Sequence, residues 1–132
     1  MAEIKVELKQ TSDSATQATM RTHQVMVDRP EPKGGKDEGA MGGELFLAGL
    51  GGCFMSNLLA AIKSREADIR NVNLTMSGTL VENPMRFSAV HLHVTAEHQD
   101  KEQLDKLIVI AERGCIVANT VKDSVDLTFS SE

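Results

Sequence analysis

One stretch decides the fold of this chain: residues 44–65, ELFLAGLGGCFMSNLLAAIKSR. Its large apolar side chains fall on every side of a helix, so a helix here has no polar face to turn to water. Gly49, Gly51 and Gly52 interrupt it, although each costs roughly 1 kcal/mol against alanine inside a helix. Close approach of another helix or backbone explains such a cost. Because a chain of 132 residues has little material to wrap this helix, we expect a second subunit to cover it.

The same stretch is long enough to suggest a membrane span. It carries Glu44, Ser56 and Asn57 among its apolar residues, which is costly inside a bilayer. The first ten residues, MAEIKVELKQ, alternate charged and apolar side chains and therefore lack the apolar run of a signal peptide. We expect a cytoplasmic protein with no membrane partner.

Composition limits the function classes further. The length fits a single domain spanning residues 1–132, and 41% of the residues are hydrophobic, which is enough for a core. The chain has four phenylalanines and no tryptophan or tyrosine, so stacking on nucleic-acid bases is nearly excluded. The net charge is -5 and the basic residues form no run. No nucleic-acid partner is expected.

The N-terminal part predicts a hairpin followed by a loop. Residues 3–9 alternate with period two and should bury Ile4, Val6 and Leu8 on one face of a strand. A second strand is predicted over residues 20–27, with a polar turn between the two. Residues 28–43 hold two prolines and five glycines and should form a loop. That loop lacks the Walker order of glycine, lysine and serine or threonine, so nucleotide binding is not expected.

The C-terminal part predicts a second hairpin. Residues 71–80 and 86–96 read as its strands, and the inward side chains of the second strand are Val90, Leu92 and Val94. His91 and His93 then share the opposite face. No third ligand lies near them in sequence, so a metal site is not expected.

Two helices and a closing strand complete the chain. Residues 100–114 predict an amphipathic helix stopped by Gly114, with a buried face made of Leu104, Leu107, Ile108 and Ala111. A short helix over 115–123 and a strand over 124–130 follow. The predicted order is ββαββααβ, which indicates an α+β fold.

The two cysteines have different local settings. Cys53 lies in the middle of the apolar helix, where burial raises a thiol pKa. Cys115 follows Gly114 at the start of a short helix, where free amides and Arg113 favour a thiolate. On local sequence alone Cys115 is thus the better thiolate, and Cys53 would need a cation from outside its own helix. Two unrelated buried thiols and a redox pair are both open at this point.

Three segments together carry a resemblance to a known family. Residues 42–61, GGELFLAGLGGCFMSNLLAA, follow a GGKDEG loop and precede RGCIVANTV at 113–121. This arrangement resembles the OsmC/Ohr family over essentially the whole chain, and its general OsmC-like branch most of all. The chain has Gly42 where that family has proline, and Ile116 where proline often follows the second cysteine. The resemblance implies an intertwined homodimer in which antiparallel sheets wrap central helices.

The resemblance also implies an activity and its residues. Family enzymes reduce small apolar alkyl or fatty-acid hydroperoxides with two cysteines, here Cys53 as the peroxidatic and Cys115 as the resolving thiol. The resemblance implies a catalytic arginine, for which Arg29 is the choice by position with Arg21 as the runner-up, and Glu44 would orient its guanidinium. The reductant would be an external dithiol such as a lipoyl protein, with no bound cofactor and no metal.

Other interpretations remain beside this one. The chain could be a non-catalytic OsmC-like dimer that binds a small apolar ligand or senses oxidant. Arg29 could be a solvated loop residue, and Glu44 an early helix charge that favours the helix dipole. The roles of Cys53 and Cys115 could be reversed. Acyl transfer lacks a Cys-His-Asn signature in this sequence.

Overall fold

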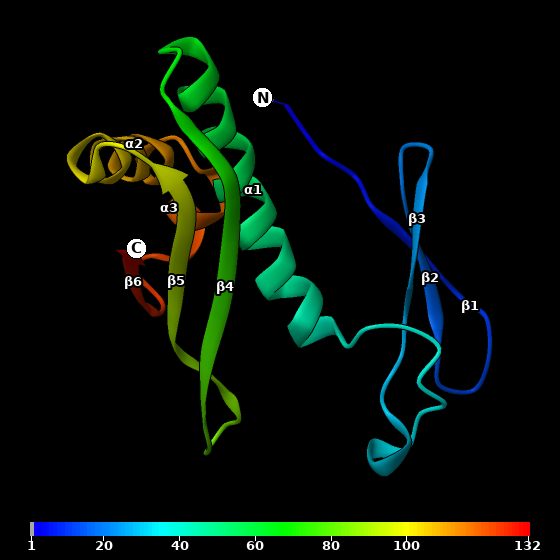
Figure 1. Ribbon diagram of the computed structural model, residues 1–132. Coiled ribbons are helices and arrows are strands. Elements are labelled where there is room, and N and C mark those ends of the chain that lie inside the picture. The colour runs from blue at the N-terminus through cyan, green and yellow to red at the C-terminus, as the bar shows by residue number, and fades with distance from the viewer. Residues whose placement is uncertain (1) are drawn as a thin grey trace. The chain divides into compact units, whose positions relative to one another are not determined.

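The computed structural model describes residues 2–132, and the chain divides into two compact units, one up to Phe46 and the other from Leu47 to Glu132. The predicted α+β class is confirmed, with two sheets and three helices (Figure 1). In chain order the elements are β1 (Glu7–Gln10), β2 (Thr16–Met20), β3 (His23–Val27), a 3-10 turn (Glu31–Lys33), α1 (Gly42–Ser64), β4 (Ile69–Val81), β5 (Arg86–His98), α2 (Lys101–Arg113), α3 (Ile116–Val121) and β6 (Asp126–Ser131).

The N-terminal unit contains an antiparallel sheet in the order β1-β2-β3, one strand more than the sequence predicted. The central strand β2 covers part of the predicted turn. It was missed because its buried side chains, at Ala18 and just before it at Ala15, are too small to give an apolar alternation. The prediction for residues 3–9 was also wrong in part, since β1 begins at Glu7 and the apolar side chains of Ile4 and Leu8 are exposed.

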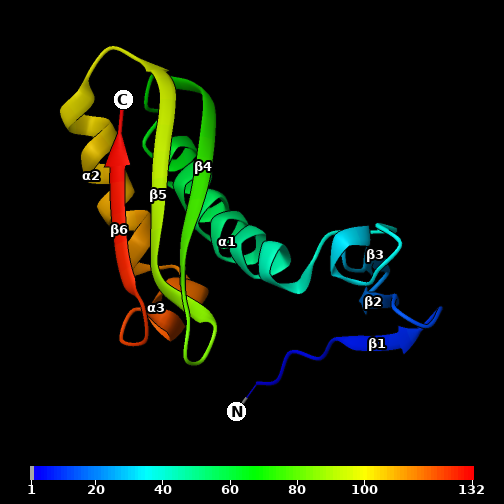
Figure 2. The same ribbon diagram turned by 90° about the horizontal axis from the view of Figure 1, so that it is seen from below.

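The C-terminal unit is built on a sheet in the order β4-β5-β6. The predicted hairpin is confirmed as the long antiparallel pair β4 and β5, and β6 lies parallel to β5 with Leu92 opposite Phe129. Helices α1 and α2 lie on one face of this sheet (Figure 2). The inward residues of β5 are fully buried against them, as predicted, and the core contains Leu50, Phe54, Leu58, Val90, Leu92, Val94, Leu104 and Leu107.

Helix α1 is apolar beyond what its own chain covers. Its length and its mean hydropathy of 1.9 over an 18-residue stretch would allow it to cross a bilayer. Only 28% of this stretch is buried within the chain. A Cβ added at Gly51 would lie 3.0–3.1 Å from side chains of β4, so α1 is closely approached there by strand side chains and not by the helix or backbone that was predicted. At Gly49 and Gly52 an added Cβ would meet open space, and Leu59 is 50% exposed. The C-terminal unit by itself therefore leaves an apolar face of α1 uncovered.

Helix α2 has the predicted bounds and buried face. Asp100 caps its N-terminus by accepting a hydrogen bond from the Gln103 amide at 3.3 Å. The helix ends at Arg113, and Gly114 follows with φ -91°, so no left-handed backbone requires glycine at this position. The side chains on the buried face are Leu104, Leu107, Ile108 and Ala111.

Candidate functional site

The two thiols of the chain meet at the junction of α1 and α3. Cys53 is a partly buried residue in the middle of α1, and Cys115 is fully buried directly before α3. The Cys115 Sγ accepts a hydrogen bond from the Ala118 amide at 3.4 Å, which caps the short helix. Cys53 packs against the buried cluster that contains Cys115, and each thiol shifts the pKa of the other. The structure thus brings together thiols that lie far apart in the sequence.

Cys53 is the thiol that its surroundings acidify. Partial burial raises its pKa, but hydrogen bonds outweigh this effect and hold the pKa below its ordinary value. These bonds come from the Val117 amide, the Cys115 thiol and the Ile116 amide. Backbone donors from α3 therefore supply the stabilisation that the sequence reasoning had sought from a cation.

Cys115 shows the opposite shift. Burial raises its pKa, the Ala118 amide lowers it, and the hydrogen bond to Cys53 and the Cys53 charge raise it further. The net direction is upward, so the pKa of Cys115 lies above its ordinary value while that of Cys53 lies below it. These directions are opposite to the expectation from local sequence that Cys115 is the better thiolate, because amides at the start of α3 lower the pKa of Cys53 as well.

A buried carboxylate that the sequence reasoning missed organises the glycine-rich loop of the N-terminal unit. Asp28 is 3% exposed and accepts hydrogen bonds from the amides of Arg29 at 2.7 Å, Lys36 at 3.1 Å and Glu38 at 3.1 Å. Burial raises the pKa of this carboxyl, but the amide bonds prevail and lower it overall. The signal in the sequence was an aspartate directly before the proline- and glycine-rich segment.

Two glycines allow this loop to close on itself. An ideal Cβ at Gly35 would lie 1.9 Å from the Arg29 carbonyl oxygen, and one at Gly39 would lie 2.2 Å from the Met26 carbonyl oxygen. Neither position has room for a side chain. Close backbone approach thus explains why Gly35 and Gly39 are glycines.

The predicted arginine and glutamate lie in the N-terminal unit, while both thiols lie in the other. Arg29 is exposed, and its carbonyl accepts the Asp37 amide at 3.0 Å. Glu44 Oε1 accepts the Met41 amide at 2.8 Å, which is one half of a capping box at the start of α1. The runner-up, Arg21, is exposed in the β2–β3 turn with φ 57°. Their catalytic roles stay predictions.

The family follows from a direct comparison. The sequence profile described as "OsmC-like protein" matches residues 35–130, which is most of the chain. The chain belongs to the OsmC-like family. No curated protein matches it.

Solved structures show the same fold for this OsmC-like chain. A hypothetical protein from Aquifex aeolicus has a TM-score of 0.86 at 18% identity, covering 100% of this chain and 96% of its own. An organic hydroperoxide resistance protein OsmC from Legionella pneumophila has 0.78 at 18% identity, covering 100% and 98%. An organic hydroperoxide resistance protein from Elizabethkingia anophelis has 0.76 at 22% identity, covering 100% and 96%.

Two histidines of the OsmC-like chain, His91 and His93, bond strand β5 to the β6 segment. His91 is hydrogen-bonded to Thr128 at 2.5 Å and to Ser130 at 2.7 Å. His93 is hydrogen-bonded to Ser130 at 2.6 Å and to Glu132 at 2.7 Å. All four ring nitrogens thus have partners on or next to β6. Among residues 2–132 no three histidine, cysteine, aspartate or glutamate side chains are grouped to hold a metal ion.

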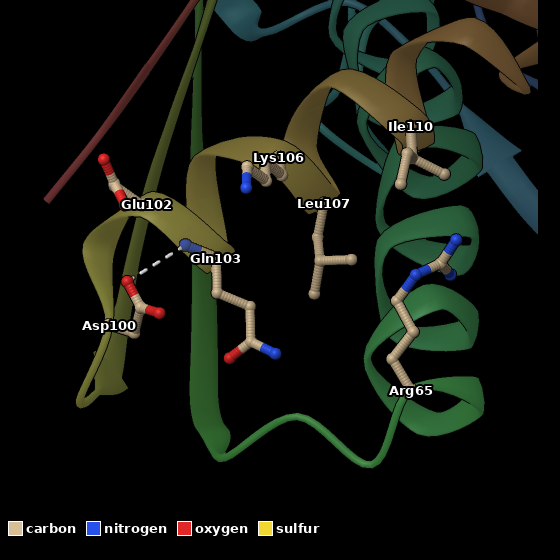
Figure 3. A pocket seen from close by; sticks show the side chains of 7 residues that line it. All are labelled: Arg65, Asp100, Glu102, Gln103, Lys106, Leu107 and Ile110. Carbon is tan, nitrogen blue, oxygen red and sulfur yellow. Dashed lines mark hydrogen bonds between the residues drawn. The ribbon is translucent and has the colours of Figure 1, made fainter.

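A separate groove lies between the end of α1 and the start of α2. It has a volume of about 360 Å³ and mixes the positive Arg65 and Lys106 with the negative Asp100 and Glu102 (Figure 3). The remaining lining residues are Gln103, Leu107 and Ile110. None of the predicted site residues, all of which the structure describes, lines this groove. The candidate functional site of the OsmC-like chain is therefore the thiol pair.

Proposed function

We propose that this OsmC-like protein is a thiol-dependent peroxidase that reduces alkyl or fatty-acid hydroperoxides to alcohols. One observation carries the proposal: Cys53 packs against the buried core that contains Cys115, and the two thiols shift each other's pKa, with the pKa lowered at Cys53 and raised at Cys115. A reactive thiolate beside a protonated partner is the arrangement that a two-cysteine peroxidase needs. The names of the hydroperoxide resistance proteins with this fold support the same reaction class.

The proposed reaction has three balanced steps. The Cys53 thiolate attacks the distal oxygen of the hydroperoxide, the O–O bond breaks, and the alkoxide leaves as the alcohol with one proton. Cys53 is then a sulfenic acid, which Cys115 attacks through sulfur, forming the disulfide and releasing water. An external dithiol reduces the disulfide and is itself oxidised to a disulfide. In the reducing cytoplasm a lipoyl protein has the required chemistry.

Mass spectrometry and two serine variants test this proposal. After one equivalent of cumene hydroperoxide, the wild type should lose two hydrogens, mapped to a bridge between Cys53 and Cys115. Cys115→Ser should consume one equivalent and accumulate a dimedone-reactive sulfenic acid, whereas Cys53→Ser should consume none. The reverse pattern would swap the two roles. A disulfide that forms once but is never turned over with dihydrolipoamide, dithiothreitol or thioredoxin would indicate an oxidant sensor.

We propose that Arg29 polarises the peroxide and that Glu44 orients the guanidinium of Arg29. A charged pair of this type forms strong, directional hydrogen bonds to an anion. Glu44→Gln keeps an acceptor for the Met41 amide but loses the charge, so it separates a catalytic role from helix capping. Lower peroxidase activity with an unchanged unfolding midpoint supports the catalytic role. If Arg29→Ala leaves the rate unchanged, the role passes to Arg21 or is refuted.

We also propose that the working form is a homodimer. The uncovered apolar face of α1, with Gly49, Gly52 and Leu59, would be stabilised by a second copy of the chain. Sedimentation across a dilution series tests this assembly. A folded monomer at micromolar concentration would contradict the dimer, and the intertwined arrangement would then have no support.

A further inference from the structure

One polar side chain of α1 is bonded to the last turn of α2. The Asn57 amide nitrogen, Nδ2, donates to the Ala111 carbonyl oxygen at 3.3 Å. Asn57 comes four residues after Cys53, so the two side chains project from the same side of α1, one turn apart. The carboxamide of Asn57 also lies against Gly114, because an ideal Cβ there would be 3.5 Å from Nδ2. Asn57 therefore lies beside Gly114, the residue directly before Cys115.

The Ala111 carbonyl needs this partner because α2 ends here. The Gly114 amide donates to Ile110 at 3.2 Å, and the Cys115 amide donates to Glu112 at 3.1 Å. Both bonds bypass Ala111, and among residues 2–132 no backbone amide donates to its carbonyl. A carbonyl at a helix end that lacks a helical partner takes one from a side chain, from water or from a tightened turn. Here the side chain comes from the helix that carries Cys53.

The turn fixed in this way carries the partners of Cys53. It holds Cys115 directly before α3, and the amides of Ile116 and Val117 follow at once. We propose that Asn57 is a positioning residue that holds the α2–α3 turn, and with it Cys115 and the two amides, against Cys53. This inference deepens the proposed function, since it concerns how the same thiol pair is assembled.

Loss of the Asn57 carboxamide should loosen the turn without removing any reacting group. In Asn57→Leu, which keeps a similar volume but has no donor, the pKa of Cys53 should rise, because its amide donors are held less firmly. Closure of the sulfenic acid to the disulfide should slow by about tenfold, the factor that corresponds to about 1.4 kcal/mol. Asn57→Gln keeps the donor on a longer side chain and should recover part of the loss.

The experiment measures the rate of Cys53 alkylation by iodoacetamide against pH. Cys115 is fully buried, so alkylation of the folded protein reports Cys53. Wild type, Asn57→Leu, Asn57→Gln and the control Ser56→Ala are compared, since Ser56 is an exposed neighbour on the same helix. We expect the pH profile of the alkylation rate to shift to higher pH in Asn57→Leu, to shift less in Asn57→Gln, and to stay in place in Ser56→Ala. An unchanged profile in Asn57→Leu, with only a lower unfolding midpoint, would overturn the proposal.

A second measurement separates this inference from the peroxidase proposal. The equilibrium between dithiol and disulfide in glutathione buffers needs no hydroperoxide, and Asn57→Leu should shift it toward the dithiol. If the wild type consumes no hydroperoxide, the peroxidase proposal fails while the alkylation profile and this equilibrium still decide the role of Asn57. If the wild type is active but both measurements match between wild type and Asn57→Leu, the Asn57 proposal alone fails.

Discussion

Replacing Gly35 by alanine should cost the N-terminal unit a large part of its loop structure. The new Cβ would lie 1.9 Å from the Arg29 carbonyl oxygen, so this oxygen must move beyond 3.0 Å. Such a movement breaks the bond from the Asp37 amide to Arg29, now 3.0 Å, and the bond from the Gly35 amide to Pro30, now 3.2 Å. Two lost hydrogen bonds at about 1 kcal/mol each, with some strain, outweigh the gain of about 0.5 kcal/mol from a stiffer unfolded chain.

We therefore expect Gly35→Ala to lower the free energy of unfolding by about 2 kcal/mol and the Tm by about 8 °C. Circular dichroism at one protein concentration measures both, since the chain has no tryptophan or tyrosine to follow. Two alanine substitutions serve as controls. Gly34→Ala meets no atom within 4 Å but has φ 95°, which should cost about 1 kcal/mol. Gly42→Ala meets no atom either and should change the free energy by less than about 0.5 kcal/mol.

The reasoning is refuted if Gly35→Ala unfolds at the wild-type midpoint. It is also refuted if Gly42→Ala is destabilised as much as Gly35→Ala, because the loss would then reflect glycine replacement in general.

Three more predictions concern single contacts. Ile116→Pro removes one amide donor to Cys53, and α3 should persist because proline suits the first helical position and the backbone of Cys115 is already extended. The pKa of Cys53 should therefore rise, and its alkylation at neutral pH should slow while the circular dichroism spectrum stays unchanged. The pKa of Asp28 is lowered in the folded protein, so its carboxylate stabilises the fold fully above the unfolded value of 3.8 and loses this effect as the pH falls through the folded pKa. Between pH 6 and pH 3 the urea midpoint should therefore fall less steeply in Asp28→Asn than in wild type. Glu44→Ala should lower the free energy of unfolding by about 1 kcal/mol through loss of the capping bond, whereas Glu44→Gln should match wild type in urea.

Periodicity in the sequence was sufficient where one face of an element is buried. The alternation around Leu92 predicted the inward face of β5, and the spacing of Leu104 and Leu107 predicted that of α2. Strand β2 could not be predicted in this way, because it buries Ala18 between polar residues and takes its stability from pairing on both edges. Its polar residues alone predict a turn, and only pairing with β1 and β3 makes the segment a strand.

The proximity of the two thiols could be expected from the family resemblance, whereas the shifts in their pKa values could not be read from the sequence. Spacing gave no reason for Cys53 and Cys115 to meet, and the pairing came from the family resemblance. The shifts in their pKa values depend on where the Val117 amide points, which the fold decides and the local sequence does not. Asp28 and Asn57 were missed because each acts through hydrogen bonds to distant backbone groups. Asp28 accepts such bonds and Asn57 donates one, and neither leaves a periodic pattern in the sequence.

The parallel placement of β6 has a consequence for synthesis. Strands β4 and β5 adjoin in the chain and can pair as soon as both have left the ribosome, within microseconds for a hairpin of about this kind. Strand β6 pairs with β5 only after α2 and α3 have been made, and such distant pairing closes late. The amides that acidify Cys53 belong to this late segment. The nascent chain therefore carries Cys53 without these amides, and the lowered pKa of this thiol begins when translation has delivered α3 to the fold.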